Sequence, residues 1–138
     1  MKGDAKPVSL IEDTAVPVQH LADYIADFKQ LLSEYNLSCV YHAHVGSGEL
    51  HLRPILNLKL KEDVRIFREL GEKVALLVKK YKGSLSGEHG DGRLRGEFIP
   101  LMIGEHNYQL LKQIKQTWDP QGILNSGKIT DTPPMDTA

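Results

Sequence analysis

The residues best suited to chemistry in this 138-residue chain are histidines in two glycine-bounded clusters. The first cluster spans residues 41–54 and holds His42, His44 and His51. Alternate side chains of a strand point to the same face, so His42 and His44 share a face. A tight turn at 46–48 is expected to bring His44 opposite His51. Two imidazoles placed in this way could ligate one divalent ion, such as zinc, iron or manganese.

The second cluster, residues 87–92, places Glu88 beside His89 among glycines. Glycines let the backbone approach a ligand closely. Glu88 would complete a set of two histidines and one carboxylate with positions open for substrate, which is typical of catalytic metal sites. His89 would then be free to act as a base beside the ion, with a pKa that its surroundings tune.

Each of these residues also has an ordinary structural interpretation. A single strand histidine is more often a hydrogen-bonded packing residue than a ligand, and an isolated Glu88 is typical of a solvated or helix-start carboxylate. Neither cluster has the lysine that follows a phosphate-binding loop. Only the two clusters together favour a metal site. We expect His20 and His106 to be solvated and Trp118 to anchor the core.

The composition excludes several classes of protein. The formal charge is −1, from 17 basic and 18 acidic residues, so the chain has no general attraction to nucleic acid or anionic lipid. The sequence contains no run of about 18 apolar residues, the length that a membrane span needs. A single cysteine, Cys39, excludes an internal disulfide framework. The N-terminus lacks the apolar segment of a signal peptide, so we expect a cytoplasmic setting.

Hydrophobic periodicity predicts the elements that position the clusters. Strands are expected at 8–13, 37–45 and 50–56, and helices at 18–35, 61–82 and 105–118, with an irregular arm at 123–129. The second and third strands form a hairpin around Gly46–Gly48. This βαββα order, followed by a C-terminal helix, predicts an α+β fold whose antiparallel sheet is covered by helices on one face.

Three motifs resemble those of the C-terminal domain of FAD-linked oxidases and dehydrogenases. Residues 44–51 are similar to the family motif H-x-G-D-G-N-x-H, residues 87–92 to G-E-H-G-x-G, and residues 118–129 to F-D-P-x-x-x-x-N-P-G-K. The motifs occur in the family's order, and the resemblance covers about residues 8 to 130. The family includes D-lactate, glycolate and D-2-hydroxyglutarate dehydrogenases. Residues 44–54 are most similar to large fusions that add an iron–sulfur electron-transfer domain.

The resemblance implies that residues 1–130 are the C-terminal, ferredoxin-like part of a substrate (cap) domain, with 131–138 as a flexible tail. It implies a 2-hydroxy acid as substrate, and FAD held mainly by a separate domain. We therefore expect an excised piece of a larger flavoenzyme, inactive alone. Its expected partners are the FAD-binding domain and an iron–sulfur domain, and not nucleic acid. Peripheral attachment at the inner face of the membrane is the alternative to a purely cytoplasmic location.

The resemblance also assigns roles to residues. It implies that His44, His51 and Glu88 ligate a divalent metal and that His89 hydrogen-bonds or deprotonates the substrate hydroxyl. It places two residues of the last motif near the flavin-domain interface, Asn125 and Lys128.

The sequence departs from the family pattern at several positions. Ser47 replaces the usual aspartate and Glu49 the usual asparagine. Arg53 stands where metal-dependent relatives have an asparagine, and an arginine there could grip a substrate carboxylate with two hydrogen bonds. Arg93 and Arg95 follow the second cluster, and one of them could face a carboxylate, with an ordinary surface charge as the equal alternative.

Three functions follow as hypotheses. The first is the metal- and substrate-binding part of an FAD-dependent 2-hydroxy-acid dehydrogenase. The second is a non-catalytic metal-binding or interaction module that partners a separate flavoprotein. The third is a structural cap that has lost its metal, and the presence of all four implied site residues argues against it.

Overall fold

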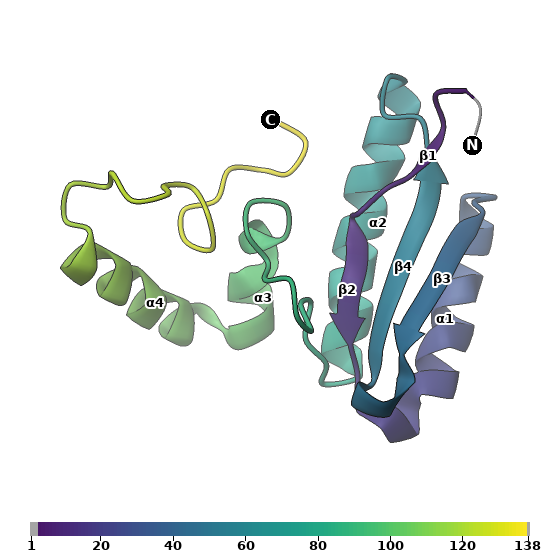
Figure 1. Ribbon diagram of the computed structural model, residues 1–138, viewed down its shortest axis with the longest axis horizontal. Helices are drawn as coiled ribbons and strands as arrows, with labels where there is room; N and C mark the ends of the chain where they lie inside the picture. The colour runs from purple at the N-terminus through teal and green to yellow at the C-terminus, as the bar shows by residue number, and fades with distance from the viewer. Residues whose placement is uncertain (1–2, 138) are drawn as a thin grey trace. The chain divides into compact units, whose positions relative to one another are not determined.

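The computed structural model describes residues 3–137 and confirms the predicted α+β fold. The chain divides into two compact units, residues 1–89 and 90–138, and each is described here by itself. In the first unit, helices cover one face of an antiparallel sheet (Figure 1). None of the helices in the described part of the chain has the length and apolarity needed to cross a bilayer.

The sheet is built around one long central strand. The strands are β1 (Lys6–Pro7), β2 (Ile11–Ala15), β3 (Cys39–His44) and β4 (Glu49–Leu56). β4 pairs antiparallel with the other three and lies between β2 and β3 (Figure 1). The predicted hairpin is therefore confirmed, whereas the single strand expected at 8–13 is replaced by the two short strands β1 and β2.

Helices α1 (Leu21–Glu34) and α2 (Lys61–Lys80) follow their predicted bounds closely and cover the same face of the sheet (Figure 1). Their buried side chains meet alternate residues of β4 to form the core of the first unit. Its largest buried members are Leu10, Tyr24, Phe28, Leu52, Leu56, Leu70, Val74 and Val78. This layer leaves the opposite face of the sheet open for polar side chains.

The hairpin register differs from the predicted one. His42 pairs with His51, and His44 pairs with Glu49, so His44 does not lie directly opposite His51 as predicted. The physical reason is the connection, a 3-10 turn at Val45–Ser47 followed by Gly48 in the left-handed conformation, which closes the hairpin on His44 and Glu49. Cross-strand partners share a face, so all four side chains belong to the open face.

A β-bulge brings two further acidic residues to that face. Ile11 pairs with Leu52 and Thr14 with Leu50, so Glu12 and Asp13 of β2 together oppose the single residue His51. The extra residue of a bulge changes the direction in which nearby side chains point, and bulges are frequent next to active sites. Both carboxylates consequently reach the site described below.

Gly48 is the tightest point of the hairpin, and we expect Gly48→Ala to destabilise the chain. Its φ is +77°, and an added Cβ would lie 2.0 Å from the carbonyl oxygen of Val16. Left-handed backbone costs a non-glycine residue about 1–2 kcal/mol and overpacking adds roughly 1–3 kcal/mol, so the free energy of unfolding should fall by about 2–5 kcal/mol.

Urea denaturation measures this effect, with Gly46→Ala in the same turn as the matched control. An added Cβ at Gly46 meets no atom within 4 Å, so this variant should stay within about 0.5 kcal/mol of the parent chain. Equal losses in the two variants would contradict the account of the turn.

The second unit contains a 3-10 turn (Gly96–Phe98), α3 (Ile99–Ile103) and α4 (Glu105–Trp118). The bounds of α4 are those predicted, whereas α3 was not predicted. It is only five residues long, too short for helical periodicity to show.

Within the expected tail, Met135 is 7% exposed and its N–H donates to Glu97 at 2.7 Å, so the described residues 131–137 pack on their own unit.

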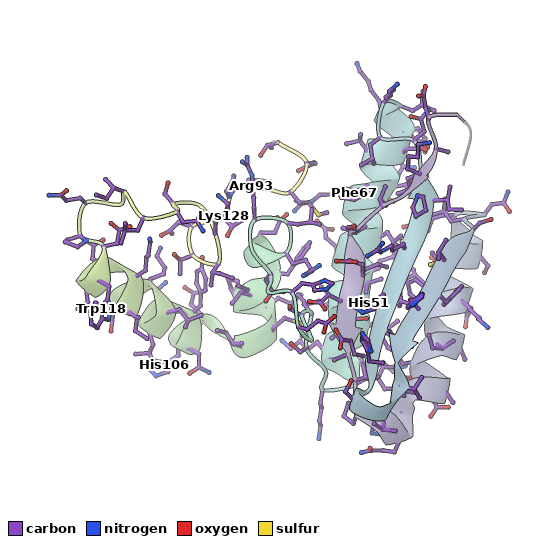
Figure 2. The ribbon with its side chains drawn as sticks, in the orientation of Figure 1. His51, Phe67, Arg93, His106, Trp118 and Lys128 are labelled. Carbon is purple, nitrogen blue, oxygen red and sulfur yellow. The ribbon has the colours of Figure 1, made fainter. Side chains whose placement is uncertain are left out.

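The prediction that Trp118 anchors the core is wrong. Trp118 ends α4 and is 81% exposed (Figure 2). It continues a helical stripe with Leu110 and Ile114, which are 45% and 57% exposed. The spacing was correctly helical, but the described residues of the unit do not cover this face.

Candidate metal and substrate site

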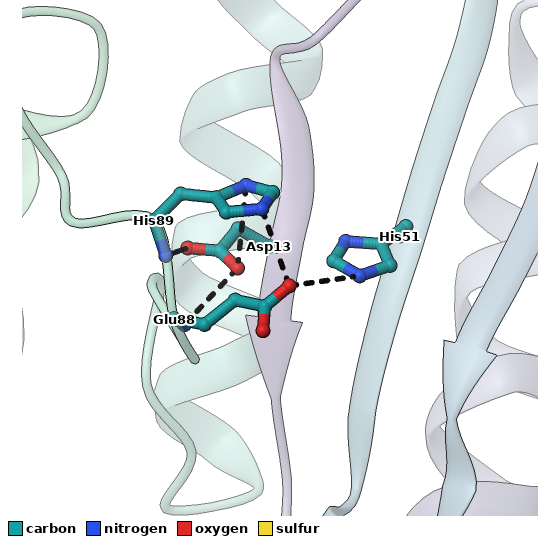
Figure 3. Close-up of side chains that lie close together, drawn as sticks. All are labelled: Asp13, His51, Glu88 and His89. Atoms are coloured by element: carbon teal, nitrogen blue, oxygen red, sulfur yellow. Dashed lines mark hydrogen bonds and ion pairs between the residues drawn. The ribbon is translucent and has the colours of Figure 1, made fainter.

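The open face of the sheet holds the predicted ligands close together. His44 ends β3. His51 lies on β4, and Glu88 comes from the segment after α2 (Figure 3). Glu88 Oε1 lies 3.8 Å from His44 Nε2 and 3.5 Å from His51 Nε2. The two imidazole rings are 5.2 Å apart between centroids, because His44 reaches His51 diagonally across the hairpin. The prediction that the two histidines are neighbours therefore holds despite the changed register.

The backbone fixes which nitrogen of His51 is free. His51 Nδ1 lies 2.6 Å from the carbonyl oxygen of Glu12. A carbonyl only accepts hydrogen bonds, so Nδ1 carries the hydrogen, and in the neutral ring Nε2 has the lone pair. That lone pair is on the nitrogen nearest Glu88, and the ring is buried. A histidine held in this way through its other nitrogen is the usual arrangement of a metal ligand.

Asp13 positions the segment that carries Glu88. Its carboxylate is fully buried and accepts hydrogen bonds from the Ser86 hydroxyl and from the N–H groups of Glu88 (3.2 Å) and His89 (2.9 Å) (Figure 3). Burial acts to raise the pKa of Asp13, but these hydrogen bonds outweigh it and hold the pKa below its ordinary value. The ionised carboxylate is thus the anchor of the segment.

His89 is held by a second carboxylate. Its Nδ1 lies 2.9 Å from Glu12 Oε1, and its Nε2 lies 3.2 Å from Glu88 Oε1. The His89 ring stacks on His51 at 5.3 Å between centroids and 15° between planes. The hydrogen bond to Glu12, above all other contributions, raises the pKa of His89 above its ordinary value. Glu12 therefore orients His89 and favours its protonated form.

Arg53 completes this chain of contacts. Its Nε and Nη2 donate to Glu12 Oε2 at 3.0 and 2.6 Å, so a line of charged groups runs from Arg53 through Glu12 to His89. Burial opposes the effect, but the contacts with Arg53 and His89 lower the pKa of Glu12. Arg53 also lines a pocket of about 200 Å³ with Val40, His42 and His51. The predicted substrate residue thus borders a cavity beside the histidines.

Glu49 is a further carboxylate in the cluster. It is 6% exposed, and its Oε1 lies 4.0 Å from His51 Nε2. Burial, followed by its hydrogen bond with Asp13, raises the pKa of Glu49. Gly87 packs directly on it, because an added Cβ at Gly87 would come within 2.8 Å of Oε1.

The donor set suits a divalent ion. Two overlapping groups each offer four ligand atoms within 4.8 Å of one another and share His51 and Glu88. Ligand atoms that each lie about 2.1 Å from one ion are about 3.0–4.2 Å apart when they subtend 90° to 180° at it. The Glu88–His44 and Glu88–His51 separations, 3.8 and 3.5 Å, fall in this range. The residues of the site therefore fit a metal.

Sequence reasoning overlooked Glu12 and Asp13 as site residues and treated Glu49 only as a departure from a motif. A signal for the first two was present, since two adjacent acids inside an apolar strand must be paired if they are buried. The bulge that presents both of them has no signature of its own in the sequence.

The remaining predicted site residues lie in the second unit. Arg93 is exposed (Figure 2). Arg95 is buried, and its guanidinium donates a hydrogen bond to the Gly90 carbonyl at 2.8 Å. Asn125 and Lys128 line a pocket of about 410 Å³ beside Trp118.

Asp119 shapes the arm that carries Asn125 and Lys128. It is buried and accepts hydrogen bonds from the N–H groups of Ile123 and Leu124, both at 2.9 Å. The aspartate of the third motif is therefore a structural residue.

Comparison with known proteins identifies the family of the chain. Residues 1–129 match the family described as FAD linked oxidases, C-terminal domain. The chain is 44% identical to D-2-hydroxyglutarate dehydrogenase of Pseudomonas putida over 94% of its own length and 13% of that relative. It is 27% identical to the glycolate oxidase subunit GlcD of Bacillus subtilis, over 90% of the chain and 26% of the relative. It is 30% identical to D-lactate dehydrogenase of Archaeoglobus fulgidus, over 93% of the chain and 28% of the relative.

The chain thus spans about an eighth of the first of these relatives and about a quarter of the other two. The family match covers nearly all of its residues. The chain therefore belongs to the family of the FAD linked oxidases, C-terminal domain.

Proposed function

We propose that this chain supplies the divalent-metal and substrate site of an FAD-dependent oxidoreductase that oxidises a 2-hydroxy acid of the lactate, glycolate or 2-hydroxyglutarate type. The observation that carries the proposal is the approach of His44 Nε2 and His51 Nε2 to one oxygen of Glu88, with His51 fixed in the tautomer that leaves Nε2 free. The printed names of the relatives support the substrate class.

In this proposal His44, His51 and Glu88 hold the ion, which is zinc, manganese or iron. A bound divalent ion supplies Lewis-acid stabilisation for the negative charge that develops on the substrate hydroxyl oxygen. The three residues come from two strands and from the Asp13-anchored segment, so the fold presents them together before any ion binds. Such pre-organisation lowers the free-energy cost of assembling the site.

His89 is the proposed base. With Nδ1–H donated to Glu12, the neutral imidazole offers its Nε2 lone pair on the side of Glu88, where the substrate hydroxyl would lie. Nε2 takes the hydroxyl proton while the adjacent C–H bond gives up its electron pair and hydrogen as hydride. Arg53, at the edge of the same cluster, would bind the substrate carboxylate, and Arg93 is retained as a second candidate.

FAD, which the family name implies, supplies the two-electron oxidant for that C–H bond. We propose that a separate domain holds most of it and that Asn125 and Lys128 lie at the interface with that domain. On this proposal the chain is inactive alone. An iron–sulfur electron-transfer domain and a cytoplasmic location, with peripheral membrane attachment as the alternative, complete the proposed setting.

Removal of the metal tests the proposal in the flavoprotein that contains or binds this chain. Anaerobic addition of D-2-hydroxyglutarate, D-lactate or glycolate should bleach the flavin absorbance for at least one of the three. Treatment with a chelator should slow that bleaching by about 10²-fold or more, because the developing alkoxide loses its counter-charge, and added Mn²⁺ should restore it. Unchanged bleaching after complete metal removal would refute a catalytic metal. Metal binding without bleaching by any hydroxy acid would favour the non-catalytic module.

A further inference from the structure

We infer that Glu49 is a fourth metal ligand, so that the ion has two imidazole and two carboxylate donors. This inference rests on the proposed metal function and adds to it a residue that the family motif does not supply, since asparagine is usual at this position. Glu49 is placed by the hairpin itself, as the cross-strand partner of His44.

The geometry places Glu49 in the same cluster as the other ligands. His44, Glu49, His51 and Glu88 each offer one donor atom, and these atoms all lie within 4.8 Å of one another. Glu49 Oε1 is 4.0 Å from His51 Nε2. That separation is in the range expected for two ligands of one ion, about 3.0–4.2 Å.

Burial supplies an independent observation that points to a cation. The Glu49 side chain is only 8% exposed, and its Oε1 has no hydrogen-bond partner among residues 3–137. A buried carboxylate oxygen without a partner is costly, because it has lost its hydrogen bonds to water and makes none to the protein. A cation bound to Oε1 would remove this cost. Gly87 leaves the space for the side chain, since any larger residue there would press on Oε1.

The alternative four-residue group replaces His44 and Glu49 with Asp13 and His89. Those two residues already have other partners, since Asp13 accepts hydrogen bonds from Ser86 and from the backbone of 88–89, and His89 Nδ1 is held by Glu12. Glu49 Oε1, by contrast, has no hydrogen-bond partner among the described residues. The group that contains Glu49 is therefore the better ligand set.

A fourth protein ligand changes which ions suit the site. A tetrahedral zinc ion with four protein ligands has no open position for a substrate. An ion that accepts six ligands, such as Mn²⁺ or Fe²⁺, keeps two, which is the number that the hydroxyl and carboxylate of a 2-hydroxy acid would fill. Carboxylate donors also favour such ions over zinc. Glu49 thus points to a six-coordinate ion as the working metal.

The test is calorimetric titration of the 138-residue chain with Mn²⁺ and with Zn²⁺. Glu49→Gln keeps the size of the side chain and a polar contact for Asp13, so the fold is expected to persist. We expect Mn²⁺ affinity to fall at least about tenfold, since even residues that only support a ligand contribute 10–100-fold. Zn²⁺ affinity should fall less, because three ligands still satisfy zinc. Glu72→Gln, which removes an exposed carboxylate from α2, is the matched control and should change neither.

The outcomes separate this inference from the proposed function. If Glu49→Gln binds Mn²⁺ like the parent chain while a variant lacking His44 and His51 does not bind it, Glu49 is structural and the inference is overturned, whereas the metal function stands. If the parent chain binds neither ion, the proposed function itself fails. If circular dichroism shows that Glu49→Gln does not fold, Glu49→Asp is the variant to titrate. Aspartate keeps the charge but has a shorter side chain, which draws the oxygen away from the ion. Its Mn²⁺ affinity should therefore fall more than its Zn²⁺ affinity.

Discussion

Replacing His51 with alanine is expected to lower the affinity of the chain for a divalent ion by about 10²-fold or more. Four ligands of a structural zinc site together contribute roughly 10–16 kcal/mol, so one ligand carries about 3 kcal/mol, or about two orders of magnitude. His51 should show at least this effect, because its Nδ1–H is anchored to the Glu12 carbonyl and its Nε2 is already oriented. Calorimetric titration with Zn²⁺ and Mn²⁺ measures the loss.

His42 offers a matched control for this prediction. It lies directly opposite His51 in the hairpin register and on the same face of the sheet, yet it belongs to neither ligand group. His42→Ala should therefore bind either ion within about threefold of the parent chain, the change that roughly 0.5 kcal/mol would produce. Equal losses in His42→Ala and His51→Ala would mean that the histidines act through general charge or folding, and the ligand assignment would be wrong.

Replacing His89 with asparagine in the flavoprotein is expected to reduce hydroxy-acid oxidation by 10²-fold or more, the lower end of the contribution of a general base. The physical reason is the loss of Nε2, which Glu12 orients through Nδ1, while asparagine retains only a weak acceptor. The flavin content should be unchanged, because His89 belongs to the metal cluster. Anaerobic stopped-flow measurement of flavin reduction separates this chemical step from later electron transfer.

His106→Asn is the control for His89→Asn, since His106 is exposed at the start of α4 (Figure 2). It should leave both the rate of flavin reduction and the flavin content at the parent level. A His89→Asn enzyme that reduces its flavin at a near-normal rate would show that the proton leaves through another group. The role proposed for His89 would then have to be abandoned.

Much of the first unit could be predicted because its elements are long and regular. α2 runs for 20 residues with apolar side chains at helical spacing, and the hairpin strands alternate around an evident turn. The exact register could not be predicted, because it depends on the 3-10 turn at Val45–Ser47, which pairs His44 with Glu49, two residues before the predicted partner His51. His44 and His51 remained neighbours only because diagonal pairs on one face also come close.

The parts of the site that sequence reasoning missed depend on tertiary structure. The bulge in β2 has no sequence signature, yet it turns both Glu12 and Asp13 toward the cluster. In the sequence, Glu49 is only a glutamate at a motif position where asparagine is usual. Its buried oxygen without a hydrogen-bond partner is evident only in the folded chain. The exposure of Trp118 likewise depends on which face of α4 is covered, and helical spacing alone does not determine this.

The central claim is that His44, His51 and Glu88 hold one divalent ion, and metal stoichiometry tests it most directly. The purified chain should be loaded separately with Mn²⁺ and Zn²⁺, dialysed, and analysed by inductively coupled plasma mass spectrometry beside the double variant His44→Ala, His51→Ala. The account predicts close to one ion per parent chain and almost none in the double variant, with both proteins folded by circular dichroism. Equal metal content in the two proteins would contradict it.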